Sequence, residues 1–189
     1  AIPNGNSGAG LYSQYEPYYY HLTYNNSLLS TYGYAYNWKA LTNNSTTLDV
    51  NAQGICPDGW HVPDTTEWAI LRDYTGDHYA CGGNNASVAK ALADVSRWNT
   101  STENCSPGAY ANNNNLTGFT AVPSGGHFEN TFHVGQVAYF WSRTVFYTHN
   151  TTPYYSYALV YKISYDSPNI SKYSYHYDRA FPVRCLRDE

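Results

Sequence analysis

The sequence has little charge, no methionine and no long apolar run. Only 13% of its 189 residues are charged, and the formal net charge is −4. Nucleic-acid binding needs a basic face, so no nucleic-acid partner is expected. No apolar run approaches the ~18 residues of a membrane span, so no transmembrane segment is expected. Because the chain lacks Met and begins at Ala1, we expect a mature, secreted chain whose leader has been removed.

Patterns for catalysis and metal binding are missing as well. The seven histidines show neither H-x-x-x-H nor H-E-x-x-H spacing, and there is no EF-hand loop. No G-x-S-x-G element is present, and carboxylates are too sparse to suggest the acid and base of a glycosidase. We therefore expect no metal, no cofactor and no enzymatic activity.

Tyrosine is in excess, with 22 Tyr against 6 Phe and 5 Trp. Tyr is common on half-buried surfaces, including contacts between subunits and with sugars. An extracellular β-rich surface with Tyr on exposed strands would have the same composition, so both readings stay open.

Residues 1–31 combine glycines with a run of tyrosines and lack helical periodicity. This pattern predicts an extended N-terminal arm before a single domain at 32–189. Such an arm can pack on its own domain or on a neighbouring copy. In the second case the assembly contact would include Tyr12, Tyr15, Tyr18, Tyr19 and Tyr20.

The stretch from Gly54 to Leu71 contains the clearest start of a helix. Asp64 is a good N-cap, and Glu67 three residues later completes a capping-box pattern. The predicted helix has an apolar face of Trp68, Ile70, Leu71 and Tyr74, and Gly76 ends it. A second helix is predicted over 87–98, where Val88, Leu92 and Val95 recur at helical spacing.

The rest of the chain favours strands. The segment 32–41 predicts a strand followed by a helix or turn, and later strands are predicted at 119–123, 136–144, 154–165, 170–175 and 181–186. In the third of these later strands an alternating apolar face is interrupted only by Val160 on its polar side. The turn residues at 166–169 predict a hairpin. Two helices before a mainly antiparallel sheet indicate an α+β domain.

Several blocks resemble one protein family. CPDGWHVPDTTEW, from Cys56 to Trp68, resembles the signature of the Fibrobacter succinogenes major paralogous domain, close to C-P-x-G-W-H-x-P-x-x-x-E-W. Further blocks agree in order: YAYNW at 34–38, GFTAVPSGG at 118–126, FWSRT at 140–144 and FPVRCLRD at 181–188. The resemblance covers roughly residue 32 to the C-terminus. The family's usual opening around W-M-x-x-N-L is absent.

The resemblance implies a C-type-lectin-like fold with a twisted antiparallel sheet. It also implies a secreted or surface-attached protein with no assigned enzymatic activity. The related sulfatase-modifying enzymes use a reactive cysteine pair near the C-terminal end, where this chain has only Cys185. Four cysteines allow three pairings. The family blocks suggest Cys56–Cys185, which leaves Cys81–Cys105 to close a middle loop. Free buried thiols are the alternative.

Nine asparagines stand in N-x-Ser/Thr sequons. Polar loops also bring Asn and Ser/Thr together by chance, and modification depends on the organism, so glycosylation is a possibility only. The sequons are at Asn25, Asn43, Asn44, Asn85, Asn99, Asn104, Asn115, Asn150 and Asn169.

Two functions fit these features. The first is a structural, self-assembling protein, the subunit of an extracellular fibre or pilus-like filament, whose partners are copies of itself. The alternative is a lectin-like module that binds glycans or a protein partner. Its aromatic contacts would be Tyr147, Tyr154, Tyr155, Tyr173, Tyr175 and Tyr177.

Overall fold

The computed structural model describes residues 2, 4, 16–22, 28–43, 53–127, 133–147 and 156–189. Within these residues the chain is a mixed α+β structure with antiparallel sheets and a few helices, as the sequence predicts. Two helices are predicted, besides a helix or turn at the end of 32–41, and the described residues contain four α-helices: α1 (Leu29–Tyr32), α2 (Trp38–Leu41), α3 (Thr65–Tyr79) and α4 (Ala89–Leu92). None of the helices in the described ranges is long and apolar enough to cross a membrane.

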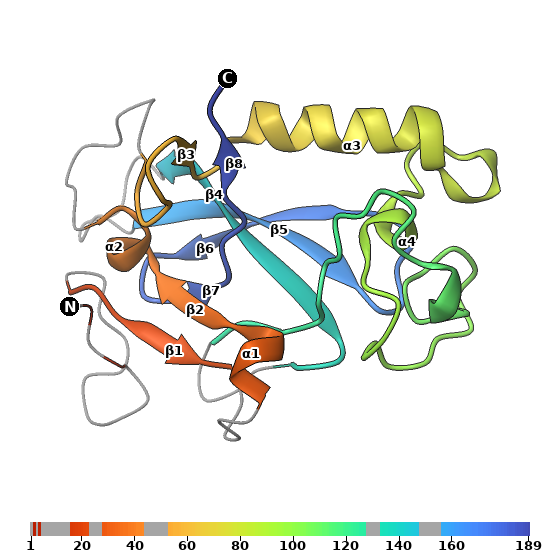
Figure 1. Ribbon diagram of the computed structural model, residues 1–189, viewed down its shortest axis with the longest axis horizontal. Coiled ribbons are helices and arrows are strands. Elements are labelled where there is room, and N and C mark those ends of the chain that lie inside the picture. Colours follow the sequence, from red (N-terminus) through yellow and green to blue (C-terminus); the bar gives the residue numbers. More distant parts are fainter. Residues whose placement is uncertain are drawn as a thin grey trace.

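The central sheet consists of β4 (Val137–Tyr147), β5 (Ser156–Ser164) and β6 (Ser171–His176), in that order (Figure 1). Core residues cover both of its faces. On one face Phe140 and Ile163 pack with Trp68 of α3. On the other face, Trp141 and Val160 pack with residues of α2 and β7. Val160 therefore lies in a second core together with Ala158 on the strand's predicted polar side, whereas Lys162 and Ser164 on that side are half-buried.

Helix α3 begins where the sequence predicts. Asp64 accepts hydrogen bonds from the backbone N–H groups of Thr66 and Glu67, and the Glu67 side chain accepts one from the Asp64 N–H. The helix does not end at Gly76 but continues to Tyr79. The predicted apolar face is also partly wrong. Trp68 is buried, whereas Ile70 and Tyr74 are 64% and 54% exposed.

The second helix is much shorter than predicted. α4 ends at Leu92, and Ala93 is already extended. The backbone there turns to pair with Ala121: the Asp94 N–H donates to the Ala121 carbonyl, and the Ala121 N–H donates to the Leu92 carbonyl. Tertiary hydrogen bonds therefore replace the helix that local propensity favours, and Val95 is left exposed.

Two predicted strands are broken up. The segment 119–123 contributes an isolated bridge between Ala121 and Ala93. The segment 181–186 divides into β7 (Ala180–Phe181) and β8 (Leu186–Arg187), which belong to different sheets. Pro182, which has no N–H to donate to a ladder, follows β7 directly.

Tyr19 and Tyr20 belong to a second antiparallel sheet, which also contains strands from later in the chain. β1 (Tyr19–His21) pairs antiparallel with β2 (Tyr34–Asn37), and β2 pairs with β7. Figure 1 shows β1 lying alongside β2 at the edge of the molecule. Tyr20 and Leu22 are buried. Deletion of residues 1–24 would therefore remove β1 and its buried side chains, and not only the residues that precede this strand.

Candidate functional site

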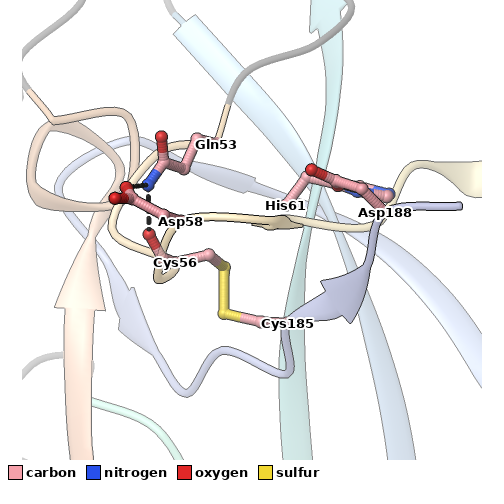
Figure 2. The surroundings of a disulfide bond; sticks show 6 residues. All are labelled: Gln53, Cys56, Asp58, His61, Cys185 and Asp188. Atoms are coloured by element: carbon pink, nitrogen blue, oxygen red, sulfur yellow. Dashed lines mark hydrogen bonds and ion pairs between the residues drawn. A yellow bond between two sulfur atoms is a disulfide. The ribbon is translucent and has the colours of Figure 1, made fainter.

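The start of the family signature, at Cys56, is covalently bonded to the C-terminal segment. A disulfide joins Cys56 to Cys185, and β3 (Trp60–His61) pairs with β8. Figure 2 shows this disulfide beside Gln53, whose side-chain amide donates to the Cys56 carbonyl and to Asp58. The second disulfide joins Cys81 to Cys105. Both pairings are those that the sequence analysis favours.

His61 lies between two carboxylates. Its Nδ1 is 2.5 Å from Asp188 Oδ1, and its Nε2 is 2.7 Å from Glu67 Oε1. Burial alone lowers the pKa of His61, but the hydrogen bonds to Asp188 and Glu67 outweigh it and raise the pKa above 6.5. When His61 is protonated, these contacts form an ionic clamp between β3, α3 and the C-terminal segment.

The clamp extends to two further charged residues. Arg143 of β4 contacts Asp64 at 2.9 Å and Glu67 Oε2 at 3.7 Å. We call His61, Glu67, Asp188, Asp64 and Arg143 the clamp. It joins β3, the start of α3, β4 and the C-terminal segment. Among the residues with assigned positions, no group of three His, Cys, Asp or Glu is arranged to hold a metal ion.

An apolar groove of about 240 Å³ lies beside the clamp. The Arg184 guanidinium lies 4.7 Å from the centre of the Phe119 ring and donates to the Phe119 carbonyl. Arg184 is exposed at the rim of the groove, and partial desolvation of its guanidinium lowers its pKa. The groove lining is mostly apolar, and it consists of Pro63, Glu67, Trp68, Leu71, Phe119, Arg184, Cys185 and Leu186.

A second candidate surface is formed by aromatic side chains on one face of β1 and β2. We call Tyr19, His21, Tyr34 and Tyr36 the tyrosine face. All four are half-buried. The Tyr19 ring meets the Tyr34 ring edge-on at 5.0 Å and stacks on His21 at 5.9 Å. Burial raises the pKa of Tyr36, and Tyr34 and Tyr19 raise it further.

The predicted assembly tyrosines are placed differently from one another. Tyr19 belongs to the tyrosine face and Tyr18 is half-buried. Tyr20 is fully buried and stacks on His127 with ring centres 4.3 Å apart, so its side chain has no surface to offer a second copy. Tyr12 and Tyr15 lie outside the described residues.

The tyrosines of the alternative, ligand-binding hypothesis are also divided. Tyr173 on β6 is exposed. Tyr175 and Tyr177 pack against the core, and Tyr177 stacks on Trp38. Tyr154, Tyr155 and the Tyr147 side chain lie outside the described part of the chain.

The sequons with described positions are mostly on the surface. Asn43, Asn85, Asn99, Asn104 and Asn169 are exposed. Asn115 is half-buried, and its side-chain amide bonds to both the hydroxyl and the backbone N–H of Thr120. Asn25, Asn44 and Asn150 lie outside the described residues. Asn115 is therefore the least accessible acceptor of the six.

A family model described as the Fibrobacter succinogenes major domain matches residues 2–187. The chain belongs to this family. No curated protein and no solved structure matches.

The match extends further toward the N-terminus than the motifs suggest. It begins before β1, whereas the recognisable blocks begin near residue 32. In this Fibrobacter succinogenes major domain, β1 is thus within the matched region. The signature His and Glu, and the closing Arg-Asp, belong to blocks far apart in sequence, and the fold brings His61, Glu67 and Asp188 into contact.

Arg143, Asp188 and Arg184 are site residues that the sequence analysis does not identify. Each lies in one of the family blocks, but a sequence block does not reveal which distant residue its side chains contact. His61 and Asp188 are 127 positions apart, so no local spacing could have joined them.

Proposed function

We propose that this protein is a secreted, non-catalytic subunit that assembles with copies of itself into an extracellular fibre. The observation that carries the proposal is the tyrosine face, where four aromatic side chains lie together and keep part of their surface exposed. Aromatic residues are enriched at protein interfaces because they combine large apolar area with a polar group.

Two further features support this function. The two disulfides are consistent with an extracellular protein. The low charge of the chain reduces electrostatic repulsion between copies. A contact between this face and a different surface of the next copy leaves an open end, so it propagates as a filament. The C-type-lectin-like fold implied by the family resemblance is part of this proposal.

The test compares two variants by negative-stain electron microscopy and sedimentation. Tyr19→Ser with Tyr34→Ser changes the tyrosine face, and Tyr173→Ser changes a 46% exposed tyrosine on β6. We expect fibres from the native chain and the control, and single particles from the double variant. Circular dichroism and thermal unfolding establish that the double variant is folded. Fibres from a folded double variant would exclude this face, and single particles from the native chain would exclude assembly.

Recognition of glycans is a second candidate, favoured by Tyr173. Its ring is exposed, and the Lys162 ammonium lies 5.6 Å from the ring centre. An exposed ring beside an amine can stack on a sugar and donate a hydrogen bond to it. On a glycan array, binding by the native chain that Tyr173→Ala abolishes would support this function. The absence of binding by the native chain would exclude it.

A further inference from the structure

The clamp needs a second proton on the His61 ring, which the ring can lose as the pH rises. A neutral imidazole has one N–H and one lone pair, whereas the imidazolium has two N–H donors. Asp188 and Glu67 each face one ring nitrogen, at 2.5 and 2.7 Å. Both contacts can therefore be hydrogen bonds only when His61 carries a proton on each nitrogen. When the ring is neutral, one carboxylate faces a lone pair.

The surroundings of the two carboxylates decide which contact is lost. Glu67 is on α3, its Oε2 accepts a hydrogen bond from the Asp64 N–H at 2.8 Å, and Arg143 lies 3.7 Å away. Asp188 is 54% exposed by its side chain and follows a strand of only two residues. Glu67 is thus fixed by groups other than His61, and Asp188 is the carboxylate that can move away.

Other charged groups on the packed elements act in the same direction. Asp64 at the start of α3 adds a negative charge, and Arg143 from β4 offsets part of it. With His61 neutral, Asp64, Glu67 and Asp188 leave the clamp with three carboxylates and a single cation. This imbalance favours the departure of Asp188, which reaches solvent most easily.

We propose that residues 186–189 form a pH-controlled latch on the apolar groove, closed when His61 is protonated and released when it is neutral. Leu186 both pairs with His61 in the β3–β8 sheet and lines the groove. Movement of this segment therefore removes one wall of the groove. The Cys56–Cys185 disulfide holds the chain immediately before it, so the moving segment begins at residue 186.

The direction with pH follows from the His61 pKa. The pKa is raised in the folded protein, so the stabilisation from the closed latch is complete below 6.5. It is lost as the pH rises through the folded value. The latch is therefore closed below the His61 midpoint of the folded protein and open above it.

The test is a pH titration of the ¹⁵N-labelled full chain by NMR, from pH 5 to 9. We expect the amide signals of Leu186, Asp188 and Gly59 to shift with the midpoint of the His61 ring. The Asp188 N–H donates to the Gly59 carbonyl, so its hydrogen exchange should also accelerate above that midpoint, after correction for the intrinsic pH dependence. Unchanged signals and protection across the His61 titration would overturn the proposal.

Two variants separate the latch from a general effect of pH. Asp188→Asn removes the second carboxylate at an exposed position, so it should lower the His61 midpoint and uncouple the segment from it. Asp166→Asn alters an exposed carboxylate that accepts a hydrogen bond from the Ser164 hydroxyl. This variant should change neither the His61 midpoint nor the coupling of residues 186–189 to it. A His61 midpoint that Asp188→Asn leaves unmoved would contradict the latch.

Discussion

At the scale of single residues, His127 is buried where a charge would be costly. It is 3% exposed, stacks on Tyr20 and exchanges two backbone hydrogen bonds with Ala180. Burial lowers the pKa of His127, and the nearby Arg179 lowers it further, to about 4. The neutral ring is therefore part of the packing between β1 and β7.

His127 should make the protein less stable as the pH falls below 6.5. Between 6.5 and about 4 the unfolded chain binds a proton at this ring and the folded chain does not, so stability falls by at most about 1.4 kcal/mol per pH unit. Urea unfolding at pH 7 and pH 5 measures the change. His127→Gln should reduce the pH dependence. His78→Gln, at an exposed ring, should not; equal effects from both would refute this assignment.

Asn37, in the family block at 34–38, makes tertiary hydrogen bonds that the sequence does not predict. It is fully buried, and its side-chain oxygen accepts from the Ala40 N–H at the start of α2 and from the Tyr18 N–H. Its side-chain amide donates to the Glu16 carbonyl. The sequence suggests a turn or helix here, but the link to residues 16–18 is a tertiary contact that no local pattern contains.

At the scale of elements, the start of α3 depends on Asp64. Asp64→Ala removes two capping hydrogen bonds and the ion pair to Arg143. Loss of an N-cap costs about 1–2 kcal/mol, and we expect a loss of this size in chemical unfolding. Asp64→Asn keeps the cap and removes the charge, so it should recover most of the stability. If the Asn and Ala variants were equally unstable, the ion pair rather than the cap would dominate.

Replacing Gly76 by Ala should destabilise the protein, although Gly→Ala usually stabilises a helix. In an exposed helix, Gly→Ala stabilises by up to about 1 kcal/mol. Here an added Cβ would lie 2.5 Å from the Asn85 carbonyl oxygen, so Gly76→Ala should destabilise by roughly 1–3 kcal/mol. Thermal unfolding measures it. Thr66→Ala, at an exposed position of the same helix, should be neutral or slightly stabilising. A stabilised Gly76→Ala variant would show that the loop at Asn85 yields.

The elements that sequence patterns predict well are those set by neighbouring residues. The capping box at Asp64 and Glu67 locates the start of α3, and the turn at 166–169 locates the β5–β6 hairpin. The failures have tertiary causes. Gly76 is required by the close approach of the Asn85 backbone and does not end the helix, and 93–98 leaves the helix because Ala121 pairs there. The middle of β5 buries residues on both sides because two cores meet at the central sheet.

At the scale of the whole molecule, the two disulfides close loops of very different length. Cys56 and Cys185 are 129 residues apart, and Cys81 and Cys105 are 24 apart. The chain-entropy relation gives about 5 and about 3.5 kcal/mol. We therefore expect the double Cys→Ala variant at 56 and 185 to lose about 1.5 kcal/mol more than the one at 81 and 105. Urea unfolding of both variants tests the order; the opposite order would mean that strain or residual structure decides.

The candidate sites were only partly predictable from the sequence. The signature block supplies His61 and Glu67, and the family blocks suggest the Cys56–Cys185 link, which is formed. The clamp itself requires Asp188 and Arg143, which only the folded chain brings to His61 and Glu67. The tyrosine face is formed by the pairing of β1 with β2. The high Tyr content of the sequence does not predict which rings lie on the same surface.

The Cys56–Cys185 disulfide also determines how the molecule would carry tension. A pull on the C-terminus passes through a covalent bond to residue 56, so the 129-residue span between the two cysteines cannot be drawn out while the bond is intact. Only chain outside the loop closed by this disulfide can lengthen under such a load. The central sheet, which lies inside the closed loop, is therefore shielded from such a load while the disulfide is intact.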